Sequence, residues 1–301
     1  MNNLILLVVC FFAGILLRRS GRMPDNAPAT LNSFIIHVSL PALTLLYLHD
    51  MTFGVNILIV SAMPWLLFAL ATGFFLLAGR WLALPRRVVG ALILTGGMAN
   101  TAFYGLPMVE AYYGHASIAT AIVIDQLGSF LVLSTLGITV AGAFSSGMAS
   151  PSQIIRRIAL FPPTIAFVVA MALKQVEYAD WFSALLKRLG DTLAPLALLS
   201  VGLQLRVSHV LLHKKELALG LAFKLLLAPF AISLLYVLLL GAHGLQTRVT
   251  LFEAAMPPMI SAAIVAAEHG LEQELSSLMV ALGLVVSFFT LAGWWYVLRG
   301  V

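Results

Sequence analysis

Polar groups that can bind a solute occur at two places inside otherwise apolar stretches of this sequence. The first is Asn100-Thr101, and the second is Ser261, which follows the Pro257-Pro258 pair. Amide and hydroxyl groups can hydrogen-bond a carboxylate, and a helix that begins beside them adds about half a positive charge at its N-terminus. This combination predicts a site for a small organic anion. The alternative is that Asn100 only caps the helix that follows it, which would not exclude binding.

The predicted substrate-binding residues share a position at or beside a break in an apolar run. They are Asn100, Thr101, Gly105, Pro107, Met256, Pro257, Pro258 and Ser261. Glycine lowers helix stability by roughly 1 kcal/mol and proline by about 3 kcal/mol, so both stretches are expected to interrupt a helix. Main-chain groups freed inside a bilayer must meet protein, water or a ligand. For either break taken alone, the alternative is a kink that only eases helix packing.

Two charged residues lie well inside apolar runs. Asp125 is about ten residues into one run and Lys224 about nine residues into another. An intramembrane charge costs at least roughly 2.5 kcal/mol on insertion scales, so it suggests a function by default. Asp125 is predicted to carry a coupling proton or to help bind a cation, and Lys224 to pair with Asp125 or to attract the substrate anion. The alternatives are a structural hydrogen bond for Asp125 and, for Lys224, an extended side chain that reaches the cytoplasmic interface.

Three further acidic residues are expected to have local roles. Glu110 and Glu253 are predicted to lie at solvated outer ends of helices. Asp191 follows Lys187 by four residues, a spacing that predicts a local ion pair on one helix face.

No catalytic or metal site is predicted. His209 and His213 have the i, i+4 spacing of zinc ligands, but the segment lacks the glutamate of the HExxH motif, so we interpret both as interfacial. Cys10 is the only cysteine, which excludes a disulfide framework and a cysteine metal site. Without a phosphate loop or a nucleophile signature, the chain is not expected to be an enzyme. The only expected cofactor is a coupling proton or sodium ion.

The composition is that of a polytopic membrane protein. Of the 301 residues, 61% are hydrophobic and only 10% are charged, with a mean hydropathy of +1.02. A soluble domain carries about 25% charged residues. The net charge of +5 comes from short basic clusters between apolar runs, which indicate membrane orientation and not a nucleic-acid partner.

Apolar runs predict an all-α fold with ten membrane spans. Their approximate ranges are 2–18, 29–49, 56–79, 88–113, 116–143, 157–174, 181–204, 216–240, 249–268 and 273–298. If the first span runs inward, the cytoplasm receives eleven of the Lys and Arg residues and the outside receives five, with Lys224 inside a span. This asymmetry predicts that both termini are non-cytoplasmic.

The two halves of the chain resemble each other. Pro41 in the second span matches Pro195 in the seventh at an offset of 154, and Met98 matches Met256 at an offset of 158. A small polar linker near the midpoint separates residues 1–150 from residues 151–301. Five spans per half make the second copy run upside down, so we predict an inverted repeat with crossed broken helices 4 and 9.

Five motifs resemble the auxin efflux carrier family, which includes bacterial malonate-carrier-like permeases. They are F-x-x-x-x-S-L-P-A (Phe34 to Ala42), N-x-x-F-x-G-x-P (Asn100 to Pro107), L-A-P-L-A-L-L-S-V-G (Leu193 to Gly202), K-L-L-L-A-P (Lys224 to Pro229) and A-A-M-P-P (Ala254 to Pro258). The resemblance implies the fold of bile-acid symporters and some sodium/proton antiporters, with a scaffold domain of spans 1, 2, 6 and 7 that includes Pro41 and Pro195. It also implies a mobile transport domain of spans 3–5 and 8–10. Plant exporters have a long loop between the halves. Because this chain lacks that loop, the resemblance does not imply that it exports a hormone.

The sequence therefore predicts a secondary transporter, or permease, of the bacterial inner membrane. Its expected substrate is a small organic anion such as a mono- or dicarboxylate, moved by elevator-like alternating access. The alternatives are a sodium- or proton-coupled antiporter or symporter of the bile-acid or sodium/proton exchanger type, and, in a different class, an intramembrane enzyme with paired acidic residues. The expected partners are the substrate and the lipid bilayer, with a homodimer as an open option and no nucleic acid.

Overall fold

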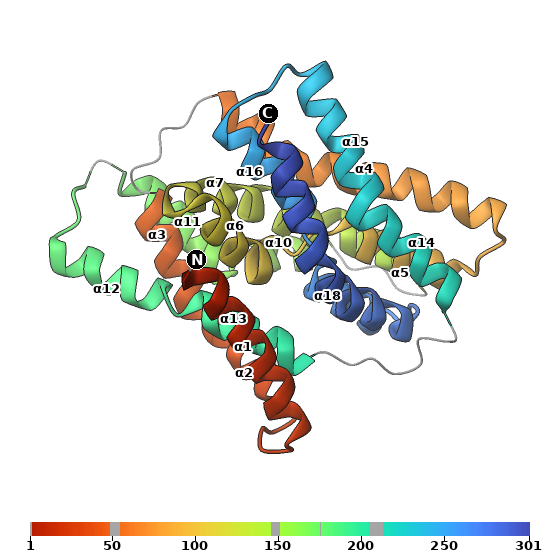
Figure 1. Ribbon diagram of the computed structural model, residues 1–301, viewed down its shortest axis with the longest axis horizontal. Coiled ribbons are helices and arrows are strands. Elements are labelled where there is room, and N and C mark those ends of the chain that lie inside the picture. The colour runs from red at the N-terminus through yellow and green to blue at the C-terminus, as the bar shows by residue number, and fades with distance from the viewer. Residues whose placement is uncertain (1, 49–54, 146–150, 175, 205–212) are drawn as a thin grey trace. The chain divides into compact units, whose positions relative to one another are not determined.

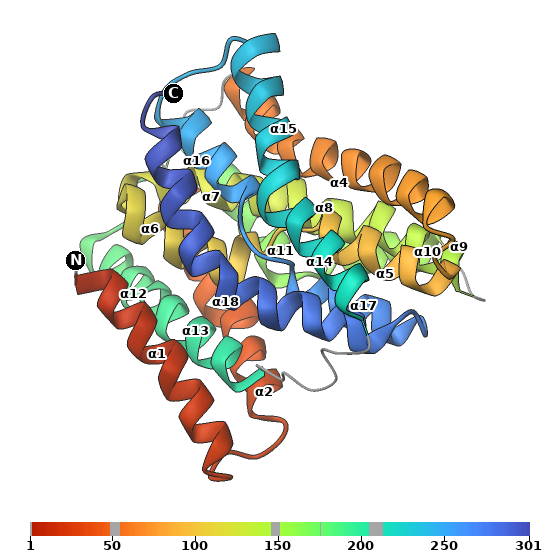
Figure 2. The same ribbon diagram turned by 45° about the vertical axis from the view of Figure 1, so that its right-hand side comes forward.

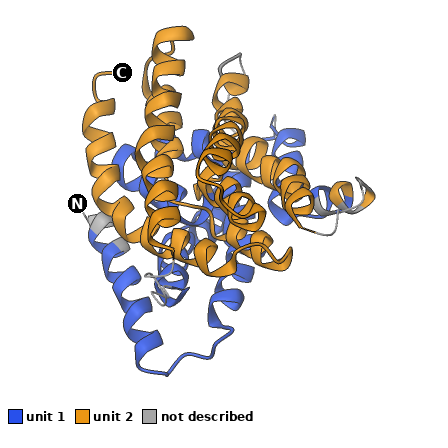
Figure 3. Cartoon of the chain, turned by 90° about the vertical axis from the view of Figure 1, so that its right-hand side faces the viewer, with its two compact units in different colours: residues 1–54, 102–122, 156–205 blue, residues 55–101, 123–155, 206–301 orange. Residues whose placement is uncertain are grey.

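A computed structural model describes residues 2–48, 55–145, 151–174, 176–204 and 213–301 (Figure 1). Within these ranges every regular element is a helix, and the only strand-like pairing is an isolated antiparallel bridge between Ala99 and Pro258. The chain forms two compact units, each built from separate parts of the sequence (Figure 3). Unit 1 contains Met1–Gly54, Ala102–Ile122 and Arg156–Leu205, and unit 2 contains Val55–Thr101, Val123–Ile155 and Arg206–Val301.

Unit 1 is organised around a close pair of helices, α1 (Asn2–Arg19) and α13 (Leu193–Gln204). The pair is close because Gly14 and Gly202 face each other: a Cβ atom on either glycine would overlap main-chain atoms of the other helix. Small residues at such positions are how apolar helices approach closely in membranes.

Five other helices of unit 1 pack around this pair or against one another. They are α2 (Ala27–Phe34), α3 (Leu40–Leu48), α6 (Leu106–Tyr113), α11 (Pro162–Ala172) and α12 (Asp180–Gly190). Helices α11 and α12 contact α3, and α2 contacts α13. A hydrogen bond of 2.6 Å from Ser200 Oγ to Asn32 Oδ1 joins α13 to α2.

Unit 2 is centred on α5 (Arg86–Gly97), whose residues from Val88 to Gly97 are all buried. Around it lie α4 (Val55–Trp81), α9 (Ile138–Phe144), α14 (Lys214–Ala222), α17 (Ile260–Glu268) and α18 (Gln273–Leu298). Helix α15 (Ala228–Leu234) continues α14 and runs beside α4, as Figure 2 shows. Helix α16 (Leu245–Ala254) contacts α4, α15 and α18.

Two of the helical stretches deform just before a proline. Pro41 lies two residues after the end of η1 (Ile35–Ser39), a π-helical turn, and Pro229 lies two residues after the end of η6 (Phe223–Leu227), another π-helical turn. A proline ring clashes with the carbonyl group four residues earlier, and widening the turn relieves that clash. Before Pro195 the chain leaves the helix altogether, so the predicted span 181–204 consists of α12 and α13, with Asp191 and Thr192 between them.

Among the described residues, five helical stretches are long and apolar enough to cross a membrane: Ala27–Leu48, Ile57–Trp81, His115–Phe144, Lys214–Leu239 and Gln273–Leu298. They correspond to the predicted spans 2, 3, 5, 8 and 10, and α11 is a shorter apolar helix in the range of span 6. The all-helical, polytopic character of the predicted fold is therefore confirmed. The ten-span inverted repeat stays a prediction, because the remaining ranges form shorter or interrupted helices.

Candidate functional site

Both predicted breaks are present in unit 2, and they meet. Helix α5 ends at Gly97, after which Met98 is extended, and the chain re-enters helical structure at Thr101 in η2 (Thr101–Gly105). Helix α16 ends at Ala254, and α17 begins only at Ile260, after an extended Met259. The Asn100 N–H donates to Pro257 O over 2.9 Å, and the Met259 N–H donates to Met98 O over 3.0 Å. The two interruptions thus pair as a short antiparallel ladder.

A buried carboxylate, that of Asp125, lies on one side of the ladder, and both of its oxygens accept hydrogen bonds. Thr101 Oγ1 donates to Asp125 Oδ1 over 2.6 Å, and Gln126 Nε2 donates to Asp125 Oδ2 over 2.9 Å. Asp125 is 3% exposed and lies in η4 (Ile124–Ser129), so the first break is tied to a second helix through its threonine. Each oxygen of this carboxylate accepts a hydrogen bond, an arrangement that favours the ionised form.

Asn100 is a polar residue at the crossing whose side chain is left unsatisfied. Its side chain is fully buried, and among the described residues neither Oδ1 nor Nδ2 has a hydrogen-bond partner. A buried polar group without a partner costs about 1–3 kcal/mol. A ligand that accepted from the amide nitrogen and donated to the amide oxygen, directly or through water, would recover that free energy.

Lys224 and Glu253 form a second buried group in unit 2. Lys224, in η6, is fully buried and donates from Nζ to Ala254 O over 2.9 Å, at the C-terminal end of α16. Glu253 is also fully buried, and it interacts electrostatically with Lys224 and Asp125. Lys224 makes no direct ion pair with Asp125 in the part of the chain that the structure describes.

The expectation that Glu253 lies at a solvated helix end was wrong. Its side chain has no exposed surface, because α16 is packed by α4, α15 and α18. A signal was available in the sequence: Glu253 lies four residues before Pro257, inside the predicted broken span and not at its outer end. Counted from the break itself, Glu253 lies only one helical turn before Pro257, which places it inside the protein.

The other predicted substrate-binding residues are distributed over both units. Met256 is fully buried in the second break, and Ser261 is half-buried in the first turn of α17. Gly105 and Pro107 follow the first break and belong to unit 1. The scaffold-side residues Pro41, in α3, and Pro195, in α13, also belong to unit 1.

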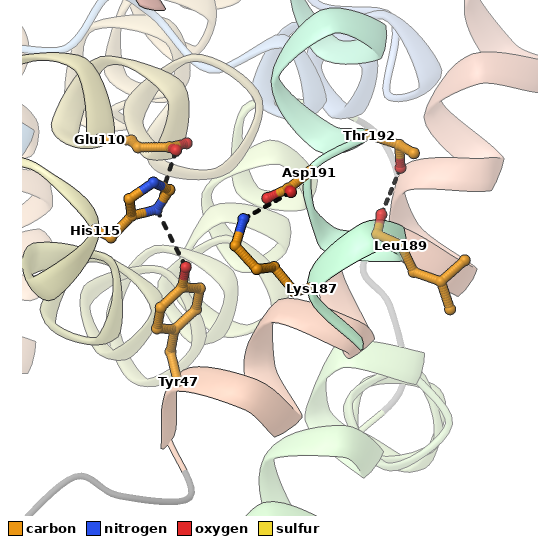
Figure 4. A network of polar contacts seen from close by, with 7 residues as sticks. All are labelled: Tyr47, Glu110, His115, Lys187, Leu189, Asp191 and Thr192. Carbon is orange, nitrogen blue, oxygen red and sulfur yellow. Dashed lines mark hydrogen bonds and ion pairs between the residues drawn. The ribbon is translucent and has the colours of Figure 1, made fainter. Parts of the chain in front are cut away.

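Unit 1 has a polar cavity of about 230 Å³ that the sequence did not reveal. Its lining includes Tyr47, Glu110, His115, Lys187 and Asp191, which Figure 4 shows from close by. His115 Nδ1 lies 3.1 Å from Glu110 Oε1 and 3.2 Å from Tyr47 Oη. The predicted ion pair of Lys187 with Asp191 is confirmed at 2.8 Å. Glu110, expected at a solvated end, is 22% exposed and faces His115.

His213, interpreted from the sequence as interfacial, lies near two glutamates of unit 2. His213 Nε2 lies 3.7 Å from Glu272 Oε1 and 3.9 Å from Glu274 Oε2, and His209 lies outside the described residues. No group of three His, Cys, Asp or Glu side chains suited to a metal ion occurs among the residues that were placed.

Comparison with known proteins identifies the family of this chain. The family model described as "Membrane transport protein" matches residues 1–152 and 148–295. An "Uncharacterized transporter" from Methanothermobacter thermautotrophicus is 27% identical over 295 residues, which cover 97% of this chain and 96% of the relative. A "Putative malonate transporter" from Rhizobium meliloti is 25% identical over 306 residues, which cover 96% of this chain and 92% of the relative. Because the family model matches both halves, the resemblance seen in the sequence motifs is confirmed, and the chain belongs to the membrane transport protein family.

Proposed function

We propose that the chain is a secondary transporter for a small mono- or dicarboxylate, which binds where the two broken helices of unit 2 meet. The observation that carries this proposal is the fully buried Asn100 amide, without a hydrogen-bond partner among the described residues, beside the paired main chains at Pro257. Such a group is costly unless something binds it. Broken helices at corresponding places in two halves are the usual construction of a transporter substrate site.

An anion suits this site because of the groups that face the break. Helix α17 starts directly after the second break, and its first N–H groups and dipole favour negative charge. Asn100 supplies an amide donor. One relative carries malonate in its name, which supports carboxylates as the class to test first.

The proposed transport cycle is elevator-like. In it, spans 3–5 and 8–10 move as the transport domain against a scaffold of spans 1, 2, 6 and 7, in a ten-span inverted repeat with both termini outside the bacterial inner membrane. The Gly14–Gly202 approach of α1 and α13 supports a rigid scaffold, because two helices packed main chain to main chain cannot slide without steric overlap.

Two measurements test this proposal: binding of candidate substrates and their uptake into proteoliposomes. The purified protein is screened for thermal stabilisation by acetate, malonate and succinate, and uptake of the radiolabelled hit is then measured in proteoliposomes. N100A should fold normally and lose at least roughly tenfold in affinity, which corresponds to about 1.4 kcal/mol. The matched control is N26A, an exposed asparagine that makes no side-chain cap. Unchanged affinity in N100A would refute the assignment of the site.

A sodium- or proton-coupled mechanism is the second candidate, and one observation favours it. Two buried carboxylates, Asp125 and Glu253, interact electrostatically within unit 2, as a cation-dependent carrier requires. Uptake measured with sodium replaced by N-methylglucamine, at fixed pH, distinguishes sodium coupling from proton coupling or from uncoupled transport.

A further inference from the structure

The charges buried in unit 2 do not balance. Asp125, Glu253 and Lys224 are each at most 3% exposed, so two acids face one base away from solvent. With all three ionised, the group would carry a net negative charge. An uncompensated buried charge is strongly unfavourable, which favours the binding of a proton or a cation by one of the acids.

Hydrogen bonding separates the two acids. Both oxygens of Asp125 accept hydrogen bonds, from Thr101 and from Gln126, which stabilise its ionised form. Both oxygens of Glu253 lack a hydrogen-bond partner within the described part of the chain. A carboxylate without donors gains least from ionisation, and Glu253 is therefore the acid better suited to hold a proton.

The neighbouring helices supply no other charge at this depth. Of the elements packed against α16, α15 has no titratable residue, α4 has only Arg80, in its last turn, and α18 has only Glu274, in its first turn, and Tyr296, near its C-terminal end. On α16 itself the remaining charge is Arg248, more than one turn before Glu253. The charges that act on Glu253 are those of Asp125 and Lys224.

We propose that Glu253 is the proton-carrying residue of this transporter, and that it takes up one proton together with each substrate anion, so that the two move in the same direction. The proposal rests on the proposed function and adds its coupling. Glu253 lies one helical turn before Pro257, whose carbonyl is paired with Asn100, so an anion bound at the break lies close to the Glu253 carboxylate. On the opposite side of the membrane, Glu253 releases the proton and the anion leaves.

The direction of coupling follows from the sign of the charges. A negative Glu253 repels a carboxylate at the break, and a neutral Glu253 does not. A unit charge about 10 Å away, at an effective dielectric constant of about 20, changes affinity roughly tenfold. Because binding linkage is reciprocal, the anion must favour protonation of Glu253 by the same factor. A cationic substrate would instead compete with the proton and produce exchange.

The experiment measures malonate affinity and proton uptake in purified protein. In the wild type, affinity should fall roughly tenfold as the pH rises across the titration of Glu253, and malonate added in weak buffer at a pH inside that range should cause uptake of up to about half a proton per site, detected with a pH-indicator dye. The E253Q side chain is uncharged and has nearly the same shape as a protonated glutamate. The variant should bind malonate with no pH dependence and without proton uptake. E268Q, at the exposed end of α17, is the matched control and should behave as the wild type.

Each outcome decides between distinct explanations. Proton uptake that persists in E253Q, or wild-type binding without proton uptake, overturns the proposal while leaving anion transport in place. Sodium-dependent binding without proton uptake also overturns it, because the cation would then balance the buried charge. Absence of carboxylate binding by the wild type at every pH refutes the proposed function instead. If E253Q does not fold, proton uptake is measured for the wild type and for D125N by calorimetry in two buffers of different ionisation enthalpy: uptake that persists in D125N supports Glu253, and uptake that is lost in D125N overturns the proposal.

Discussion

The main-chain N–H of Asn100 donates to the carbonyl oxygen of Pro257 over 2.9 Å, and this bond joins breaks from opposite halves of the chain. Both partners are fixed by their neighbours: Asn100 by the end of α5 at Gly97, and Pro257 by a second proline that cannot donate a hydrogen bond.

Gly283 is expected to be required for the position of Pro258. A Cβ atom at Gly283, on α18, would lie 2.5 Å from Cδ of Pro258, and Leu221 limits movement on the other side. G283A should therefore destabilise the protein by about 1–3 kcal/mol and weaken malonate binding. Thermal unfolding in detergent and ligand stabilisation measure the two effects. G293A, on the same helix with nothing within 4 Å of its Cβ position, should change neither, and equal behaviour of the two variants would contradict this packing.

Removing the Thr101 hydroxyl should disturb the site without changing its shape. T101V leaves Asp125 Oδ1 without its 2.6 Å hydrogen bond, at a cost of about 1–3 kcal/mol in a buried position. We expect a lower unfolding temperature and a loss of malonate affinity. The control is T139V, whose hydroxyl is exposed and bonds only to Thr135 O in its own helical run. A T101V protein as stable as T139V would show that the Thr101–Asp125 bond contributes little.

Lys224 and Glu253 should be energetically coupled. K224M alone leaves Glu253 without its favourable charge and removes the bond to Ala254 O, so a loss of about 3–5 kcal/mol is expected. The double variant K224M/E253Q should lose less than the sum of the single variants, with a coupling of about 0.5–3 kcal/mol. A double-mutant cycle on unfolding free energies in detergent measures this coupling, and strict additivity would exclude it.

The α1–α13 contact in unit 1 should tolerate no side chain at its glycines. G202A places a methyl group against main-chain atoms of α1 near Phe11 and Gly14, and we expect a loss of about 1–3 kcal/mol in stability. The control is G73A, where a Cβ atom meets nothing within 4 Å. Unfolding temperatures of the two variants provide the comparison. If G202A were neutral, the helices would be separating or shifting to make room, which would argue against a rigid scaffold.

The sequence by itself determined the membrane class, the positions of both helix breaks and the family. These features depend on local chemistry: mean hydropathy, the helix-breaking action of glycine and proline, and motifs read along the chain. The Lys187–Asp191 pair was predictable for the same reason, since i, i+4 residues share a helix face.

Only the tertiary structure decided which polar groups meet. Thr101 and Asp125, Lys224 and Ala254, and Tyr47 and His115 come from separate helices, and no local rule states which helices will be neighbours. The burial of Glu253 has the same origin: α4, α15 and α18 cover a residue that spacing alone placed at a solvated end. Burial and charge balance are properties of packed neighbours, so they become visible only when distant segments are brought together.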